Sequence, residues 1–398
     1  MIRKRNKARK AGKDVMRERF SRLFLIIFFF ASSLAFLPSA FSLTSSIKIG
    51  VIGPETGEEA ETGLATLAGV LFALENLNNA GGIDGKKVEV IHLDNKGNPQ
   101  TTQAAVHKMI KEGVVAIISS PTGWSTFAPT WMANDARVIF MSAGSKRHIA
   151  RGGPFIFRNA LSDEIATEDV IRYVIKEFDY KNCSMITSMR DDETSLTIGG
   201  LYRRAVIKNG GRIVSETHLF MDATIEEAIA KLKKDAKGTI DAIIFAGDDA
   251  VAVDILKELK KQGVKAPIIG GDILYTENFL KDAKELAVGT IIYSGFFHEA
   301  KLPDVQKFVS EYKNKTGKKP TYYAASAYDS FMLIAEAIKT AKSLDTLKIR
   351  DALLQIKDFN ALTGKTTMGR DRETIKKPFI LQVVKGEKGI AFKEVGIK

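Results

Sequence analysis

An alternation of short apolar segments with helix-forming segments between residues 47 and 145 constrains the fold of this chain more than any other feature. Residues 47–57 form an apolar segment that ends in a Gly/Pro turn, and a helical pattern then continues to Asn79. Further apolar segments follow at 87–94 and 114–120, with another helical segment between them. Strands that alternate with helices predict a parallel sheet covered by helices, and small ligands bind such sheets at the carboxyl ends of the strands. We therefore expect a ligand-binding lobe of the α/β class.

The residues before this lobe have the pattern of a secretory signal. Ten Lys and Arg against two acids occupy the first 22 positions, and an apolar run follows at residues 23–37. This run is shorter than the roughly 20 residues that span a bilayer, and the small residues Ala40 and Ser42 suit a cleavage site before Leu43. We expect a signal peptide at residues 1–42 that is removed on export; an uncleaved membrane anchor is the alternative.

The basic character of the chain lies largely in this leader. The net charge of +12 becomes +4 when the ten basic and two acidic residues of the leader are set aside, so the basic balance does not indicate nucleic-acid binding.

Cys183 is the only cysteine, which excludes an intrachain disulfide bond, and its strand-like surroundings indicate a buried side chain rather than a nucleophile. The remaining ~350 residues exceed what one hydrophobic core organises, so we expect two domains.

A second series of strands and helices follows an irregular stretch at residues 146–164, which we interpret as a crossover between lobes. Strand-like and helix-like segments alternate again from Asn182 to about Gly295. A long helix with one apolar face is expected at 324–342, and the tail from Thr366 alternates like an antiparallel ribbon that turns at Lys385-Gly386. The chain shows no short-period repeat and no low-complexity linker.

Residue patterns typical of enzymes and metal sites are missing from the sequence. The five histidines have no ligand spacing, and no CxxC, HExxH or GxSxG pattern occurs. Residues 363–367 resemble the end of a phosphate loop, but Phe359 stands where the motif requires glycine, so we interpret the segment as a turn. Adjacent acids such as Asp191-Asp192 are commoner as solvated helix caps than as acid/base pairs. We expect a binding protein rather than an enzyme, without a cofactor or a metal ion.

Several segments together resemble the type I periplasmic solute-binding proteins of ABC transporters, the leucine/isoleucine/valine-binding protein family. The resemblance spans nearly the whole chain after the leader, and its main segments are 53–99, 114–123, 136–145, 263–272 and 322–338. It implies two Rossmann-like α/β lobes with a central ligand cleft and a three-segment hinge. By the same resemblance, we expect lobe 1 at 46–164 plus 295–374 and lobe 2 at 165–294 plus 375–398.

The resemblance implies that lobe 1 binds the carboxylate of an amino acid with hydroxyl and backbone N–H groups from two loops. A buried anion needs several such donors, and helix N-termini supply some of them. The alternative for Thr122 and Ser145 is that they only cap helices. Trp124 is either a wall of the cleft or a residue of ordinary packing. The other candidate residues are Thr122, Gly123, Ser142, Gly144, Ser145 and Lys146.

The resemblance also implies that lobe 2 supplies an acid for the ligand's ammonium group, and the matching residue is Asp272. Asp248 follows a neighbouring strand and could face the same cleft; the alternative is that each carboxylate caps the helix after it. Family positions that carry aromatic residues around the ligand hold Thr62, Thr194 and Asp248 here, which argues against a large apolar pocket. Arg190 and Lys146 could instead receive a second carboxylate, and related members bind urea, short amides or aromatic acids.

We therefore expect an extracytoplasmic, periplasmic receptor of an ABC importer that captures an amino acid or a similar small polar ligand. Its partners would be that ligand and a membrane permease, with no nucleic acid, and we expect a monomer. Contacts that the ligand makes only in the closed form would drive closure of the lobes. A membrane-tethered sensor of the same fold is the alternative, and the mass of the mature chain would distinguish the two. A hydrolase would be revealed by turnover of a bound ligand.

Overall fold

Two large sheets carry the fold in a computed structural model, which describes residues 46–189, 193–220, 223–387 and 389–396. The first sheet has five parallel strands in the order β2-β1-β3-β4-β5. All of its strands except β2 are buried almost along their whole length, as is typical of a parallel sheet that helices cover on both faces. The strands are β1 (Ile47–Gly53), β2 (Val88–Asp94), β3 (Ala116–Ser119), β4 (Ile139–Ala143) and β5 (Ile156–Asn159).

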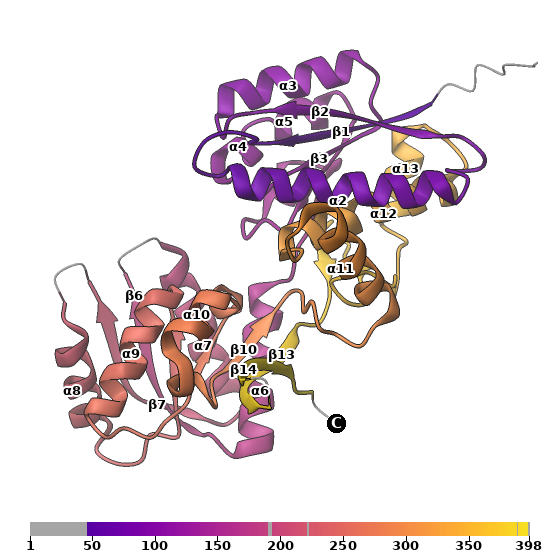
Figure 1. Cartoon of the computed structure of the whole chain (residues 1–398). Helices are drawn as coiled ribbons and strands as arrows, with labels where there is room; N and C mark the ends of the chain where they lie inside the picture. The colour runs from indigo at the N-terminus through magenta and orange to yellow at the C-terminus, as the bar shows by residue number, and fades with distance from the viewer. Residues whose placement is uncertain (1–45, 190–192, 221–222, 388, 397–398) are drawn as a thin grey trace, which may run out of the picture. The chain divides into compact units, whose positions relative to one another are not determined.

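Helices lie on both sides of the first sheet (Figure 1). The long helices α2 (Ala60–Asn79) and α12 (Tyr322–Ala341) pack against each other on one side, with α13 (Thr346–Leu353) beside α12. Their contact is close, because a side chain at Gly69 would overlap the backbone of Ala324. The helices on the other side are α3 (Pro99–Lys111), α4 (Gly123–Phe127) and α5 (Thr130–Asp135).

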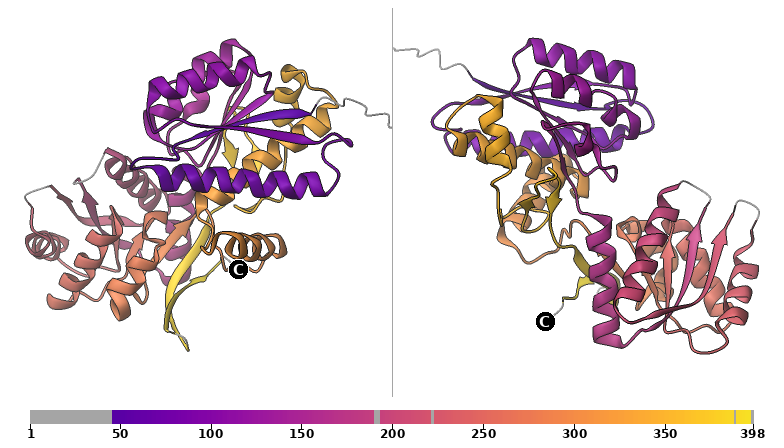
Figure 2. Two further views of the ribbon diagram at one scale, coloured as in Figure 1. Left: turned by 45° about the horizontal axis from the view of Figure 1, so that its top comes forward. Right: turned by 180° about the vertical axis from the view of Figure 1, so that it is seen from behind.

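The second sheet has seven strands in the order β14-β13-β10-β9-β8-β6-β7. The strands from β6 to β10 run parallel, whereas β13 and β14 are antiparallel to their neighbours. Figure 2 shows this sheet with helices on either side. The strands are β6 (Asn182–Ser188), β7 (Arg212–Leu219), β8 (Ala242–Ala246), β9 (Ile268–Gly270), β10 (Ile291–Ser294), β13 (Phe379–Gly386) and β14 (Gly389–Glu394).

The helices of the second sheet form two layers with separate apolar cores. On one side α6 and α7 pack together, and on the other side α8, α9 and α10 do so. Two 3₁₀ turns, η2 (Asp272–Leu274) and η3 (Lys284–Ala287), flank α10. The helices are α6 (Asp163–Phe178), α7 (Glu193–Lys208), α8 (Ile225–Ala236), α9 (Asp249–Lys261) and α10 (Glu277–Ala283).

The chain passes three times between the two lobes, as the predicted three-segment hinge requires. The first passage follows β5 and the second follows β10, after which α11 (Pro303–Thr316) packs on α2 through its aromatic side chains. The third passage follows the short ribbon of β11 (Thr367–Met368) and β12 (Thr374–Ile375) and leads into β13. Residues 160–162, 295–302 and 376–378 therefore connect the elements of one lobe to those of the other.

Residues 146–164, predicted to be irregular, instead contain a 3₁₀ turn at Ile149–Gly152, the strand β5 and the start of α6. The four residues of β5 include Arg158, so the sequence lacks the apolar pattern of a strand. Arg158 is only 2% exposed, and its guanidinium forms a salt bridge of 2.5 Å with Glu373.

The antiparallel ribbon predicted for the tail is present as β13 and β14. Gly386 pairs with Gly389, so the turn comes after Gly386 rather than at Lys385-Gly386.

The predicted signal peptide at residues 1–42 lies outside the described residues. Within the described ranges, no helix is both long and apolar enough to cross a membrane.

Cys183 is fully buried in β6. The loss of solvent and, to a smaller extent, the negative charge of Asp241 raise the pKa of its thiol to about 12. The prediction of a buried cysteine is therefore confirmed.

Candidate functional site

The loop after β3 and the first turn of α4 place Thr122, Gly123 and Trp124 at the carboxyl end of the first sheet. The buried Thr122 hydroxyl lies 2.6 Å from the hydroxyl of Ser125, so it bonds a side chain rather than capping a backbone N–H of α4. Gly123 has a φ of +57°, a left-handed conformation that favours glycine. Trp124 is 65% exposed, which excludes ordinary core packing for this side chain.

The end of β4 carries Ser142, and the loop after it carries Gly144 and Ser145. Ser142 is fully buried, and its hydroxyl has no hydrogen-bond partner among the residues that the structure describes. Gly144 has a φ of +96°, and a Cβ at this position would lie 3.1 Å from the ring of Tyr322. The Ser145 hydroxyl accepts a bond from the Arg147 N–H at 3.1 Å, so it closes a turn and caps no helix. This tight turn presents the side chain of Lys146.

Lys146 connects this loop with two carboxylates. Its Nζ lies 2.8 Å from Oδ1 of Asp163 at the start of α6, and 3.0 Å from Oδ2 of Asp272 in η2. Loss of solvent alone would lower the pKa of Lys146, but the carboxylates of Asp272 and Asp163 raise it above its ordinary value. Lys146 is therefore charged at neutral pH. The cluster of Lys146, Asp163 and Asp272, which we call the ion cluster, has one positive and two negative charges.

Tyrosine side chains surround the ion cluster. Tyr293 of β10 and Tyr202 of α7 are fully buried, with ring centroids 6.4 Å apart, and the Tyr293 hydroxyl donates to Asp163 at 3.4 Å. Burial, together with the charges of Asp163 and Asp272, raises the pKa of both tyrosines, so both keep their protons. Within the described part of the chain, the Tyr202 hydroxyl has no hydrogen-bond partner. The tyrosines bury one side of the ion cluster, while the side chains of Lys146, Asp163 and Asp272 remain 35%, 16% and 24% exposed.

The two acids that follow strands of the second sheet have different roles. Asp248 caps α9, because its carboxylate accepts a bond of 2.8 Å from the N–H of Val251. Asp272 stands one residue inside η2 rather than at its cap, and its carboxylate bonds Lys146. The helix-cap alternative thus applies to Asp248 but not to Asp272. Asp163 was missed by the sequence reasoning, since an acid in the first turn of a helix is common for purely local reasons.

Of the remaining predicted site residues, Thr62 and Trp124 have described side chains, and neither makes a hydrogen bond to the ion cluster. Thr62 is half-buried in the first turn of α2, where its carbonyl accepts the hydroxyl of Thr66. Thr194 belongs to α7, but its side chain lies outside the described part of the structure, as does Arg190. The guanidinium of Arg147 lies 5.9 Å from the centre of the Trp124 ring.

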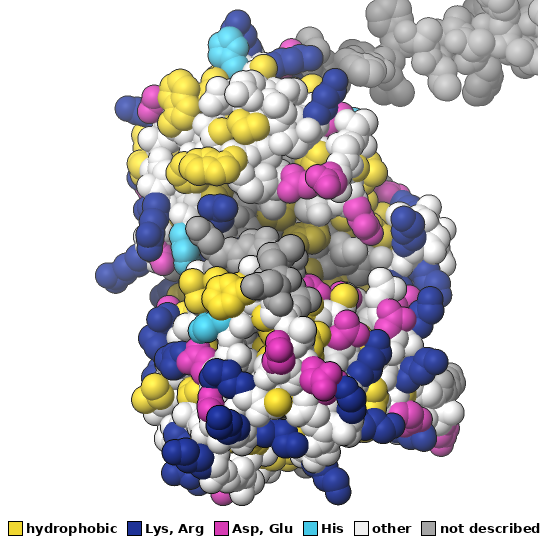
Figure 3. Space-filling model, turned by 90° about the vertical axis from the view of Figure 1, so that its left-hand side faces the viewer, with side chains coloured by type: hydrophobic (Ala, Val, Ile, Leu, Met, Phe, Trp, Pro, Cys, Tyr) yellow, Lys and Arg dark blue, Asp and Glu magenta, His cyan; other side chains and the backbone are white. Residues whose placement is uncertain are grey.

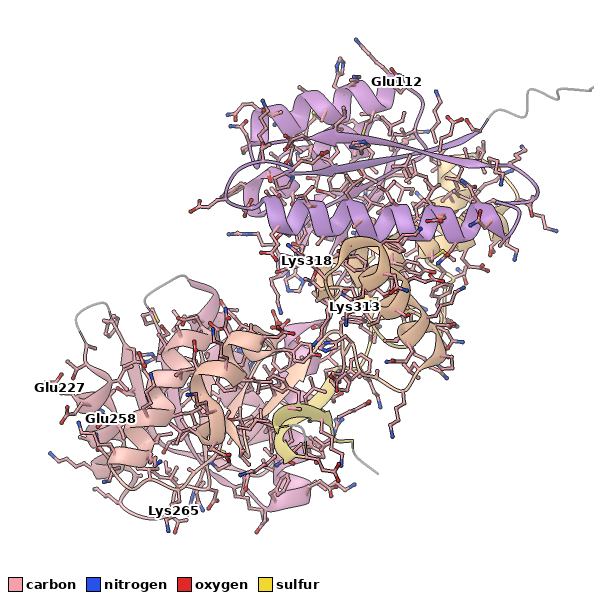
Figure 4. The ribbon with its side chains drawn as sticks, in the orientation of Figure 1. Glu112, Glu227, Glu258, Lys265, Lys313 and Lys318 are labelled. Carbon is pink, nitrogen blue, oxygen red and sulfur yellow. The ribbon has the colours of Figure 1, made fainter. Side chains whose placement is uncertain are left out.

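Charged side chains of both signs also lie outside the ion cluster, on the visible face and elsewhere among the described residues (Figure 3). Figure 3 shows Lys and Arg mixed with Asp and Glu over the visible face, as on an ordinary solvated surface. In Figure 4 the labelled Glu112, Lys265 and Lys313 lie at the outside of the ribbon, and all three are exposed. Among the described residues, no group of three His, Cys, Asp or Glu side chains is placed to hold a metal ion.

The fold and the ion cluster can now be compared with known proteins. Residues 46–389 match the model of a family described as periplasmic binding protein. The leucine-, isoleucine-, valine-, threonine- and alanine-binding protein of Pseudomonas aeruginosa is 24% identical over 381 residues, which cover 95% of this chain and 98% of that protein.

Solved structures show the same arrangement of strands and helices. A putative branched-chain amino acid ABC transporter protein from Rhodospirillum rubrum superposes with a TM-score of 0.79 at 22% identity, over 88% of this chain and 100% of that chain. A branched-chain amino acid substrate-binding protein from Streptococcus pneumoniae, solved with isoleucine, has a TM-score of 0.67 at 27% identity. That match covers 88% of this chain and 99% of the other.

Proposed function

The chain belongs to the periplasmic binding protein family, and we propose on this premise that it captures an amino acid or a similar small polar ligand for an ABC importer. The family consists of substrate-binding proteins rather than enzymes. The observation that carries the proposal is the contact between Lys146 and Asp272, at 3.0 Å. These two residues follow β4 of the first sheet and β9 of the second, and open α/β sheets bind ligands at such carboxyl ends of strands.

The proposed site has a carboxylate side and an ammonium side. On lobe 1, the loops with Thr122, Gly123 and Trp124 and with Ser142, Gly144, Ser145 and Lys146 would receive the ligand's carboxylate. The buried Ser142 hydroxyl supports this side, because it is a donor without a partner among the described residues. On lobe 2, Asp272 would receive the ammonium group. Asp248 is needed for the cap of α9, so the proposal gives it no ligand contact.

The proposed ligand is small and polar rather than large and apolar. Thr62 and Thr194 stand at positions where the sequence resemblance would place aromatic residues around the ligand. The relative from Pseudomonas aeruginosa is named for binding threonine and alanine as well as branched-chain amino acids, which supports an amino-acid ligand of modest size. We therefore expect alanine, threonine and valine among the best candidates.

Export and delivery complete the proposal. The basic and apolar leader supports secretion with cleavage before Leu43, which would place the mature chain outside the cytoplasm, where a membrane permease would receive its ligand. We propose that lobe 1 comprises 46–164 plus 295–374, that lobe 2 comprises 165–294 plus 375–398, and that the chain acts as a monomer. Nothing in the described part of the structure favours the tethered-sensor alternative.

A thermal-shift screen tests this function. The chain from Leu43 keeps the compact unit 46–398, and unfolding and refolding would remove any ligand carried from the cells. The proposal expects one or a few amino acids to raise the melting temperature, because a ligand that binds only the folded state stabilises it. Simple sugars and nucleotides serve as controls. Stabilisation by a sugar, with none by any amino acid, would contradict the proposal.

A further inference from the structure

A cavity of about 200 Å³ lies between α2, α11 and α12, beside the first sheet. The loop that carries Phe359 and Leu362 closes it, and its described lining residues include no member of the ion cluster. An apolar cavity of roughly 150 Å³ is enough to bind benzene, so this one has room for a small organic molecule. The proposed function uses none of its side chains.

Three aromatic rings line this cavity. Phe308 of α11 and Tyr328 of α12 have ring centroids 5.2 Å apart, and Phe359 comes from the loop. The Tyr328 hydroxyl accepts a bond of 3.3 Å from Asn76, and the backbone N–H of Phe359 donates to the carbonyl of Thr366 at 2.9 Å. These bonds hold the rings in place before any ligand arrives. Because aromatic rings attract cations, the wall favours a positively charged ligand.

Acidic side chains outnumber basic ones around this cavity. Asp304 and Glu311 of α11 line it, whereas Lys307 is the one lysine among its described lining residues. Lys307 is 65% exposed, and its Nζ lies 3.9 Å from Glu311, so it pairs with that carboxylate only loosely. Burial first, and then the carboxylates of Asp304 and Glu311 among others, raise the pKa of Tyr328. The negative charges therefore act on the aromatic wall itself.

A buried carboxylate also lines the cavity. Asp329 is only 1% exposed and accepts three bonds from the loop, from the backbone N–H groups of Leu362 and Thr363 and from the Thr363 hydroxyl. Burial nevertheless raises the pKa of Asp329, although Lys376 opposes this shift. Its surroundings thus stabilise its negative charge poorly, and a cation in the cavity would stabilise it further.

The same surroundings distinguish between kinds of cation. A primary ammonium group brings three donors that need acceptors, but the Asp329 oxygens already accept three bonds, and Met332 and Leu362 add apolar wall. A metal ion needs several oxygen ligands, and no group of three His, Cys, Asp or Glu in the described part of the chain is placed to supply them. A quaternary ammonium group needs no hydrogen bonds and packs well against aromatic rings.

We propose that this cavity is a second binding site, which takes a small quaternary ammonium compound. The rings of Phe308, Tyr328 and Phe359 hold the methylated ammonium group, and the carboxylates of Asp304 and Glu311 attract its charge. The site goes beyond the proposed function and does not depend on it. A compound in this cavity and an amino acid at the ion cluster would therefore occupy the chain at the same time.

Calorimetric titration of the refolded chain from Leu43 with choline and with 3,3-dimethylbutan-1-ol tests the proposal. The two probes have the same shape, but only choline is charged. Choline should bind at least ~10-fold more tightly, because the neutral alcohol loses the attraction to the rings and the carboxylates. Equal affinities would show a merely apolar cavity and overturn the proposal, as would the absence of choline binding at millimolar concentrations.

Three substitutions locate the site. Phe359→Leu keeps an apolar side chain but removes a ring, and it should weaken choline binding by at least ~5-fold. Asp304→Asn changes an exposed residue without risk to folding and should weaken choline binding by about 2-fold or more. Asp254→Asn removes the same charge from the surface of α9, where the side chain is 58% exposed, and should leave choline affinity unchanged.

The variants also separate this site from the ligand site of the proposed function. Choline affinity that is unchanged in both Phe359→Leu and Asp304→Asn would contradict the proposal. Choline binding that survives Phe359→Leu but is lost in Asp272→Asn would place choline at the ion cluster and overturn the second site. Neither result would affect the proposed function, because the thermal-shift screen tests that function with amino acids.

Discussion

The ammonium nitrogen of Lys376 lies 2.7 Å from the side-chain oxygen of Asn159, and this contact joins two of the three passages between the lobes. Asn159 ends β5 directly before the first passage, and Lys376 begins the third. Lys376 is only 2% exposed and makes a second bond of 2.7 Å to the Thr363 hydroxyl. Thr363 in turn donates to the buried carboxylate of Asp329. This network fixes the points at which both passages leave the first lobe.

Replacement of Lys376 by methionine should destabilise the protein at neutral pH. Methionine fits the same volume but leaves the Asn159 oxygen and the Asp329 charge without their buried cation. We expect the free energy of unfolding in urea to fall by about 2–4 kcal/mol. Lys377→Met, at the exposed neighbouring position, should change it by less than about 0.5 kcal/mol. Equal effects of the two substitutions would contradict the network.

The same lysine should give the protein a distinctive dependence of stability on pH. Burial lowers the pKa of Lys376 to about 8 from its ordinary 10.5; Asp329 opposes this shift and Arg158 adds to it. Between pH 8 and 10.5 the unfolded chain holds a proton that the folded chain has lost, so this group makes folding more favourable as the pH rises.

Urea unfolding of the wild-type chain and of Lys376→Met at pH 7.5 and at pH 10 measures this effect. The stability of the wild type relative to the variant should increase over that interval, by at most about 1.4 kcal/mol for each pH unit. Other titrating groups affect both proteins alike and cancel in the difference. A difference that stays constant, or that shrinks, would be incompatible with a lowered pKa at Lys376.

Alanine at Gly144 should be less well tolerated than alanine at other glycines with positive φ. The φ of +96° strains any side chain, and the added Cβ would also press on Tyr322. Gly113 is the matched control, since it has a φ of +76° and open space around it. We expect Gly113→Ala to cost about 1 kcal/mol in thermal unfolding and Gly144→Ala at least about 1 kcal/mol more. Gly144→Ala should also weaken ligand binding, because Lys146 shifts with the turn.

Substitutions at Asp272 and at Asp248 should affect different properties. The first should weaken ligand binding, and the second should lower the stability of the fold. Asp272→Asn is expected to weaken amino-acid binding by about 2–4 kcal/mol in calorimetry, because a charge-assisted bond to the ligand is lost. Asp248→Ala should leave affinity within about twofold and lower the free energy of unfolding by about 1 kcal/mol, because it removes the cap of α9. The reverse result would show that Asp248 and not Asp272 contacts the ligand.

Much of the fold could be predicted because its signals are local. The first strand, the helix ending at Asn79 and the antiparallel tail all have the periodicity that burial imposes, and the structure confirms each of them. β5 was missed because a four-residue strand containing Arg158 has no such period. Arg158 is tolerated there only because Glu373, more than two hundred residues later, meets it in the folded chain.

The site could be predicted only in part for the same reason. Asp272 and Lys146 follow strands, so their place at the carboxyl ends could be inferred from the sequence. Asp163, Tyr202 and Tyr293 give no sequence signal of their own, because a helix-initiating acid and a buried tyrosine are common everywhere. Their meeting around Lys146 depends on tertiary packing, which brings residues far apart in the sequence together.

The most direct test of the account is a calorimetric titration of the refolded chain from Leu43 with the amino acid selected by the thermal-shift screen. The account predicts saturable binding to one site per chain with a dissociation constant of micromolar or below, abolished or strongly weakened in Asp272→Asn. A folded protein that releases no heat with any amino acid, or that binds one equally well without the Asp272 carboxylate, would contradict it.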